Sequence, residues 1–145
     1  MAGESRAPRA LLCDTNVLVR ILTDDPPAQA RAAARALDSA ADRGTRVIVT
    51  DIVVAELAYV LTTGYGVARE EAARLLRSVL SLPAVEVTDQ VMLAEAIDIW
   101  TDHPLDFADA YLAALGRGTL DMGVLSFDRD HDRIPGVTRV DPREI

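Results

Sequence analysis

Hydrophobic positions along the chain follow two spacings, one typical of short strands and one typical of helices. Short apolar runs predict strands at residues 10–13, 46–50, 85–87, 124–125 and 137–140. Between them, apolar residues at helical spacing predict helices at residues 16–23, 26–44, 51–63, 68–80, 89–100 and 106–115. This alternating order predicts an α/β sandwich with a mostly parallel central sheet flanked by helices.

The chain of 145 residues is long enough to bury a core, and half of its residues are hydrophobic. We expect a flexible N-terminal tail at residues 1–9 and a single domain at residues 10–145. The polar start, MAGESRAPR, does not resemble a signal peptide. The longest later apolar region contains Asp51 and Glu56, so no membrane span is predicted. A cytoplasmic location is therefore expected.

The scarcity of Cys, His and Lys excludes several kinds of site. One Cys and two His exclude an intrachain disulfide and a zinc site built from Cys and His. All 15 basic residues are Arg, which excludes the phosphate-binding lysine of a P-loop and Schiff-base catalysis. The formal net charge of −8 argues, taken alone, against a nucleic-acid partner.

Carboxylates follow two of the predicted strands directly. Asp14 comes at the end of the first strand, and Asp128 and Asp130 lie just past the strand at 124–125. Because sites in parallel sheets form outside the carboxyl ends of the strands, we expect these acids at one rim. A solvated cluster of charges in a turn explains the second pair about as well. His131, in the same charged loop, is expected at the surface.

Carboxylates also occur in two of the predicted helices, where simpler explanations exist. Glu56 is the only charged residue of IVVAELAYVL and fits one exposed position on a mostly buried helix. Asp106 and Asp109 lie three residues apart on one helix face, where they fit an N-cap and a capping box. The apolar residues that follow Asp109 predict a buried helix whose first turn points into the fold.

A divalent cation would explain why these acids occur together. Carboxylates gathered at one rim repel each other and raise one another's pKa values unless a cation neutralises them. Oxygen ligands without His or Cys suit Mg²⁺ or Mn²⁺. We therefore expect Asp14 to be buried between apolar segments, with its charge paired to such an ion.

The chain resembles the PIN-domain ribonucleases and, within them, the VapC-type toxins of bacterial toxin–antitoxin pairs. The resemblance covers nearly the whole chain and rests on four segments in order: DTNVLVR (14–20), AEL (55–57), DFADAYLAA (106–114) and SFDRD (126–130). It implies a PIN-like three-layer sandwich. Any one of these segments would be a weak indication, but the ordered set is specific.

The resemblance also implies a role for each acid. The catalytic and metal-binding residues would be Asp14, Glu56, Asp109 and Asp128, with Asn16, Ser126, Asp106 and Asp130 in support. Ser126 stands where the family most often has Thr, and it keeps the hydroxyl. The implied activity is that of an endoribonuclease dependent on Mg²⁺ or Mn²⁺. Metal-activated water would cleave the phosphodiester and leave 5′-phosphate and 3′-hydroxyl ends.

The partners implied by the resemblance are RNA as substrate, a small DNA-binding antitoxin, and a second copy in a homodimer. Leaving out the five acids nearest the implied site reduces the formal charge from −8 to −3, which weakens the charge argument against RNA. The five are Asp14, Glu56, Asp106, Asp109 and Asp128. Arg20, Arg129 and Arg133 are candidates for holding phosphates, although each also fits an ordinary surface charge.

Two other functions stay open from the sequence. A haloacid-dehalogenase-like phosphatase also begins with Asp after a strand. It needs a second Asp two residues later, where this chain has Asn16, and a Lys, which this chain lacks. A non-catalytic PIN-like module would bind RNA or a protein without cleaving it. The complete set of acids argues against that module.

Overall fold

The computed structural model describes residues 8–119 and 121–145. In this part of the chain there are six α-helices: α1 (Thr15–Thr23), α2 (Pro27–Arg43), α3 (Asp51–Tyr59), α4 (Arg69–Leu80), α5 (Gln90–Asp102) and α6 (Phe107–Gly116). Three shorter helical segments are η1 (Val60–Gly64), η2 (Arg129–Arg133) and η3 (Pro142–Glu144). None of the described helices is both long and apolar enough to cross a membrane.

The strands are β1 (Ala10–Leu12), β2 (Arg46–Ile48), β3 (Val85–Glu86), β4 (Val124–Leu125) and β5 (Arg139–Val140), and all of their pairings are parallel. The predicted α/β class with parallel strands and flanking helices is confirmed. Of the predicted tail at residues 1–9, only Pro8 and Arg9 belong to the described residues.

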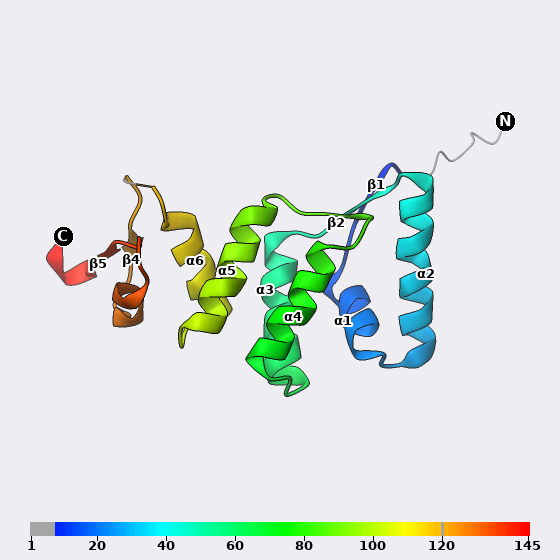
Figure 1. The fold of residues 1–145 in the computed structure, drawn as a ribbon, viewed down its shortest axis with the longest axis horizontal. Coiled ribbons are helices and arrows are strands. Elements are labelled where there is room, and N and C mark those ends of the chain that lie inside the picture. Colours follow the sequence, from blue (N-terminus) through cyan, green and yellow to red (C-terminus); the bar gives the residue numbers. More distant parts are fainter. Residues whose placement is uncertain (1–7, 120) are drawn as a thin grey trace.

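The strands form two sheets, so the prediction of one central sheet was wrong. The first sheet has the order β1-β2-β3, and β4 pairs with β5 in the second. Figure 1 shows α3, α4, α5 and α6 between the two sheets, with β4 and β5 beyond α6. The two-residue strand β4 obtains its ladder bonds from β5, through Val124 N–H to Thr138 O and Ser126 N–H to Val140 O. Its position is therefore independent of β1.

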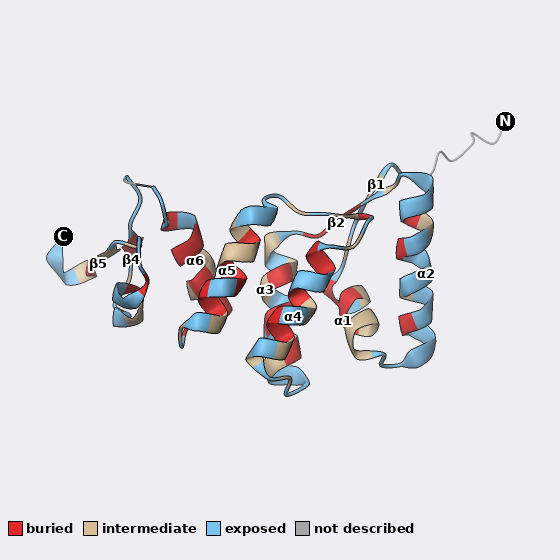
Figure 2. Ribbon diagram, in the orientation of Figure 1, coloured by how far each residue is buried: buried red, intermediate tan, exposed pale blue. Residues whose placement is uncertain are grey.

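The main core lies between helices rather than on the sheet. Leucines from α3, α4 and α5 are essentially inaccessible to solvent, among them Leu57, Leu76 and Leu93. Ile134, which follows η2, belongs to the same core. A smaller cluster around Leu37 and Val47 packs α2 against the sheet. Figure 2 shows the buried positions concentrated on the inward faces of α3 to α6.

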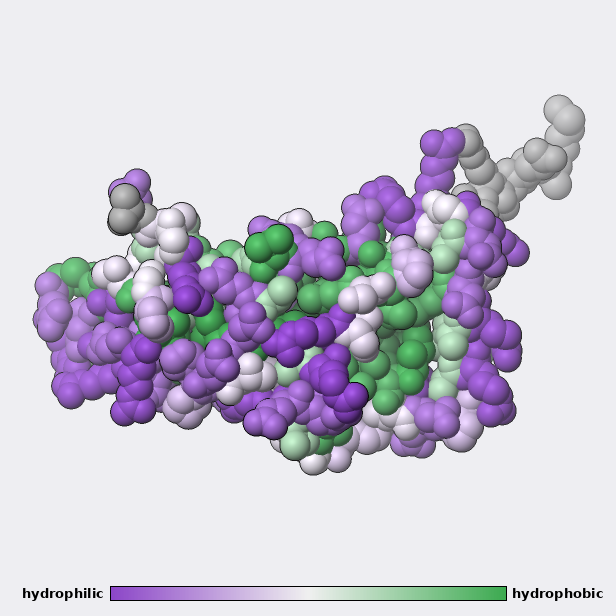
Figure 3. Space-filling model, viewed as in Figure 1, coloured by the Kyte–Doolittle hydropathy of each residue, from purple (hydrophilic) through white to green (hydrophobic). Residues whose placement is uncertain are grey.

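Two sequence features set the start and the end of helices next to the first sheet. The Thr50 side chain accepts a hydrogen bond from Val53 N–H and caps α3 directly after β2. Gly44 ends α2 with a positive φ of 68°, a conformation that glycine adopts without steric cost. Figure 3 shows hydrophobic surface exposed between α4 and α2 on the face that it presents. The helices therefore leave part of the apolar surface uncovered.

Candidate functional site

The start of α1 and the middle of α3 form one side of the candidate site. Asp14 is the residue before α1, in extended conformation, and Glu56 lies on α3. Both line an open hollow of about 300 Å³, together with Asn16, Arg20 and Tyr65. We call this the α1–α3 hollow. Because Asp14 and Glu56 share it, the structure brings together two of the four acids implied by the resemblance.

Thr15 fixes the orientation of Glu56 in this hollow. Its hydroxyl donates a hydrogen bond of 2.8 Å to Glu56 Oε2. The threonine is buried, with 4% of its surface exposed, whereas Glu56 is exposed. Thr15 was not among the predicted site residues, although its place between Asp14 and Asn16 in the DTN segment could have indicated it.

Asp14 is exposed, so the expectation of a buried charge was wrong. The physical reason lies in the strand before it. β1 is at the edge of its sheet, and the neighbouring Leu12 side chain is 79% exposed. Asp14 follows this edge strand and lines an open hollow, so it keeps its contact with solvent.

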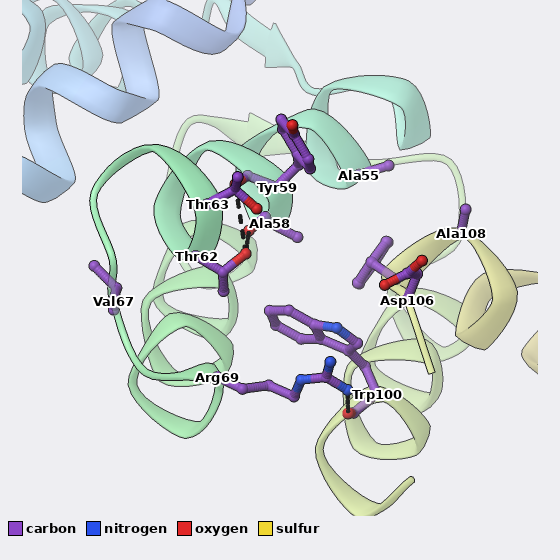
Figure 4. Close-up of a pocket in the computed structure, with 11 residues that line it drawn as sticks. Ala55, Ala58, Tyr59, Thr62, Thr63, Val67, Arg69, Trp100, Asp106 and Ala108 are labelled. Atoms are coloured by element: carbon purple, nitrogen blue, oxygen red, sulfur yellow. Dashed lines mark hydrogen bonds between the residues drawn. The ribbon is translucent and has the colours of Figure 1, made fainter. Parts of the chain in front are cut away.

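Asp106 lines a second hollow, of about 440 Å³, formed by residues of α3, η1, α4, α5 and α6. It occupies the N-cap position of α6, as the capping explanation predicts. Its side chain, however, accepts no capping hydrogen bond in the described residues. Figure 4 shows Trp100 between Arg69 and Asp106. The Arg69 guanidinium lies 5.2 Å from the Trp100 ring centroid. Asp106 therefore faces a hollow that is separate from the α1–α3 hollow.

Asp109 lies in the first turn of α6, near His131 of η2. Its Oδ1 is 3.7 Å from His131 Nε2. The expectation that His131 is at the surface was wrong, since its side chain is fully buried. Neither ring nitrogen has a hydrogen-bond partner among the described residues. The η2 turn directs this ring inward, while its charged neighbours face solvent.

Ser126, Asp128 and Asp130 form a chain of hydrogen bonds after β4. Ser126 Oγ accepts from Asp128 N–H at 3.0 Å, and Asp128 Oδ1 accepts from Asp130 N–H at 2.9 Å. Asp128 thereby caps η2. Arg133 lies 3.7 Å from Asp130 in the same turn. These residues are carried by the C-terminal segment, on the side of α6 away from α3 (Figure 1).

The three arginines proposed for phosphate binding lie in two separate places, like the acids. Arg20 lines the α1–α3 hollow, where its Nε donates to Gln29 Oε1 at 2.9 Å and its Nη1 donates to Asp25 O at 3.2 Å. Arg129 and Arg133 are exposed on η2, beside Asp128. Only Arg20 therefore lies with Asp14 and Glu56.

The donor atoms suit a hard divalent cation, but one chain does not assemble them. The acids offer carboxylate oxygens, the ligands that Mg²⁺ and Mn²⁺ prefer. Among residues 8–119 and 121–145, however, no three His, Cys, Asp or Glu side chains gather closely enough to hold a metal ion. The expectation that all four acids reach one rim is not met, because β4 lies outside the sheet that contains β1.

A hydrogen bond between Tyr111 and Asp51 joins α6 to α3. Tyr111 Oη donates to Asp51 Oδ2 at 2.6 Å, and this bond raises the pKa of Tyr111 to about 12. No sequence signal pointed to the pair, since 60 residues separate its members. The bond fixes the position of α6 relative to the start of α3.

Comparison with known proteins assigns the chain to a family. The family model of the PIN domain matches residues 11–137, which include all four acidic segments. No curated protein and no solved structure gave a match. PIN domains are in general nucleases, and they typically depend on metal ions. The match extends over most of the 145 residues, and the chain therefore belongs to the PIN-domain family.

Proposed function

We propose that this protein is an endoribonuclease dependent on Mg²⁺ or Mn²⁺, and that it is the toxin of a toxin–antitoxin pair. The observation that carries the proposal is the PIN-domain match over residues 11–137, with every acidic segment inside it. The shared hollow of Asp14 and Glu56 supports it, since a carboxylate that precedes α1 and one on α3 face the same solvent-accessible space.

The side chains in the α1–α3 hollow have distinct roles in this proposal. Asp14 and Glu56 are ligands for the cation, and Thr15 holds Glu56 in place through its hydroxyl. Asn16 lies in the same hollow, and Arg20 supplies a guanidinium for a phosphate. When bound, the cation would supply positive charge for the phosphodiester and an activated water as nucleophile, and hydrolysis would leave 5′-phosphate and 3′-hydroxyl ends.

An antitoxin is the partner that we propose. Ile52 and Tyr59 of α3 are 78% and 65% exposed, next to the hollow that contains Glu56. A small DNA-binding protein with an amphipathic segment would cover these side chains. An Arg of that segment would pair with Asp14 and Glu56 and compete with the cation. In this proposal the toxin acts in the cytoplasm and its antitoxin is encoded beside it, so the two proteins are expected to co-purify.

The proposed activity can be tested by incubating the purified protein with total RNA and Mg²⁺. We expect cleavage that stops on chelation by EDTA and resumes with excess Mg²⁺ or Mn²⁺. The Asp14→Asn variant should lose more than about a hundredfold in rate while its circular dichroism is unchanged. Asp38→Asn, an exposed carboxylate on α2, is the matched control and should cleave at the wild-type rate.

The same experiment separates this proposal from the non-catalytic alternative. A module that only binds RNA would retard the RNA on a gel and leave it intact with either cation. Cleavage by Asp14→Asn at the wild-type rate would instead show that the hollow is not the site. The phosphatase alternative has no support from the family match, and hydrolysis of a small chromogenic phosphate ester is not expected.

A further inference from the structure

The second hollow, which Asp106 lines, lies next to both groups of acids. Ala55 and Ala108 also line it, and they directly precede Glu56 and Asp109 in the sequence. Its volume of about 440 Å³ falls within the range of about 300–1,000 Å³ that is typical of small-ligand sites. We call it the Asp106 hollow. An RNA strand whose phosphate lies at either group of acids therefore brings a neighbouring nucleotide to this hollow.

Asp106 offers hydrogen-bond acceptors at one side of the hollow. It is exposed, and its side chain accepts no capping hydrogen bond among the described residues. An N-cap aspartate normally accepts such a bond from the first turn of its helix. Its two carboxylate oxygens are therefore available to a ligand. Because an ionised carboxylate accepts hydrogen bonds and cannot donate them, a group bound there must carry donors.

Arg69 offers hydrogen-bond donors at the other side of Trp100 (Figure 4). Its Nη1 is held by the carbonyl oxygens of Trp100, His103 and Leu105, at 2.7 to 3.1 Å. In the described residues these bonds use Nη1 alone, so the fork formed by Nη2 and Nε keeps its N–H groups for a ligand. A guanidinium fixed in this way loses little freedom on binding. The hollow thus has donors on one side and the acceptors of Asp106 on the other.

Aromatic and small side chains form the rest of the hollow. The Trp100 and Phe107 rings pack edge to face with their centroids 5.6 Å apart, and both residues are buried. They give the hollow a rigid floor. Tyr59 lines the hollow as well and is 65% exposed, so its ring is accessible for stacking. Ala58 adds little bulk. A planar ligand with polar edges fits these walls.

We propose that the Asp106 hollow binds one guanine base of a single-stranded RNA, next to the phosphodiester that is cleaved. This inference rests on the proposed function and adds a sequence preference to it. The Tyr59 ring stacks on the base, as aromatic side chains do in sites for unpaired bases. Asp106 accepts hydrogen bonds from guanine N1–H and N2–H, and the Arg69 fork donates to O6 and N7.

Guanine is the RNA base whose two edges both match these side chains. Its Watson–Crick edge presents two adjacent donors, which suit the two oxygens of a carboxylate. Its other edge presents two adjacent acceptors, which suit the guanidinium of an arginine. Adenine has an amino donor in place of O6, and this donor would face Arg69. Cytosine and uracil lack N7, and neither has two adjacent donors. The hollow therefore favours guanine over the other three bases.

Binding of short labelled RNA in EDTA tests the hollow without relying on cleavage. The probes are oligouridylates with one central guanosine, inosine, 7-deazaguanosine or adenosine. Inosine lacks the N2 amino group, and 7-deazaguanosine lacks N7. We expect the guanosine probe to bind about tenfold more tightly than the adenosine probe, with the two analogues between them. Quenching of Trp100, the only tryptophan, should accompany guanosine binding, because this residue lines the hollow.

Two variants assign the affinity to single contacts. Asp106→Ala should bind the guanosine probe about tenfold more weakly and no longer distinguish it from inosine, because the acceptor of the N2 amino group is gone. Tyr59→Ala should weaken all four probes about tenfold, because stacking does not depend on the base. Asp38→Ala removes the same charge from an exposed position of α2 and should bind as wild type does. Circular dichroism confirms that each variant is folded.

Three outcomes of the binding test would overturn the proposal. Equal affinity of wild type for the guanosine and adenosine probes would show that the hollow does not select guanine. The absence of binding to any probe would show that it is not an RNA site. An equal loss for all four probes in Asp106→Ala would show that its carboxylate does not contact the edge of the base.

Mapping the cleavage sites of wild type in Mg²⁺ separates this proposal from the proposed function. We expect a guanine beside most of the cleaved bonds. Cleavage with no preference for a neighbouring guanine would overturn the role of the Asp106 hollow and leave the nuclease assignment intact. Selective binding of the guanosine probe by a protein that cleaves no RNA would support the hollow and contradict the proposed function.

Discussion

Thr15 Oγ1 donates a 2.8 Å hydrogen bond to Glu56 Oε2 and thereby connects the first turn of α1 with α3. The donor is buried and the acceptor faces the α1–α3 hollow. A hydroxyl in this position removes rotational freedom from a carboxylate that would otherwise sample several rotamers in solvent. Thr15 is therefore a positioning residue for Glu56.

Thr15→Val should weaken catalysis more than it weakens the fold. The substitution keeps the shape of the side chain and removes the hydrogen bond to Glu56. Because Glu56 is exposed, water replaces the lost donor, and the free energy of unfolding should fall by no more than about 1 kcal/mol. The RNA cleavage rate should fall about tenfold, since Glu56 is no longer held in position. Urea unfolding and initial cleavage rates measure the two effects.

Two further variants check that interpretation. Thr15→Ser restores the hydroxyl and should recover most of the activity. Among the described residues, the Thr101 hydroxyl bonds only to carbonyls of its own helix α5, so Thr101→Val should leave cleavage unchanged. Equal activity of wild type and Thr15→Val would show that Glu56 does not need this bond.

The bond from Tyr111 to Asp51 should make stability fall at high pH. It raises the pKa of Tyr111 to about 12, chiefly because the phenol must stay protonated to donate. An unfolded tyrosine has a pKa of about 10. The stabilisation is thus complete below about pH 10 and is lost as the pH rises through about 12. Thermal melts across this range, with tyrosine absorbance, provide the measurement.

Tyr111→Phe is the matched comparison for that pH dependence. It should lower the free energy of unfolding at neutral pH by about 1 kcal/mol, because Asp51 loses its donor and its Oδ1 is already buried without a partner in the described residues. Its melting temperature should then fall less steeply above about pH 10. The chain has no Lys, so few other groups titrate in this range. An unchanged slope would contradict the assignment.

The order of strands and helices could be predicted because each element has its own spacing of apolar residues. The position of β4 could not, since spacing identifies a strand but not the strand that pairs with it. The burial of His131 could not be predicted either, because the sequence of a loop does not determine which of its side chains point inward. Its neighbours Asp130, Asp132 and Arg133 are charged, yet one residue of a tight turn can point inward while the others face solvent.

The sequence indicated that the candidate acids share one function. It did not indicate how they are arranged in space. Asp14 and Glu56 meet because β1 and β2 are neighbours and the helix after each begins at the same edge. Asp109 and Asp128 depend on where α6 and β4 pack. That packing is set by side chains distributed through the whole second half of the chain.

Arg69 should be one of the most important polar residues for stability. Its Nη1 lies 2.9, 3.1 and 2.7 Å from the carbonyl oxygens of Trp100, His103 and Leu105, where it joins α4 to the end of α5. Arg69→Met keeps the aliphatic volume but leaves these carbonyls without their donor. We expect a loss of about 2 kcal/mol in the free energy of unfolding. Fluorescence of Trp100, the only tryptophan, reports unfolding in urea.

Arg31→Met provides the control for Arg69, because Arg31 is exposed on α2 and should change stability by less than about 0.5 kcal/mol. Arg69→Lys should lie between wild type and Arg69→Met. A lysine can reach a carbonyl, but it lacks the planar group that stacks on Trp100. Comparable unfolding midpoints for Arg69→Met and Arg31→Met would contradict the proposed role.

A single deoxyribose at the scissile position should leave the chemical step of RNA cleavage nearly unchanged. Water is the nucleophile in the proposed reaction, so the neighbouring 2′-hydroxyl forms no bond to phosphorus. Its loss should raise KM through weaker binding and change kcat by less than about threefold. Single-turnover cleavage of matched oligonucleotides, with end-group analysis of the products, measures both effects. Products with 2′,3′-cyclic phosphate ends, or complete loss of cleavage at saturating substrate, would show instead that the ribose hydroxyl is the nucleophile, and the carboxylates of the α1–α3 hollow would then need a different role.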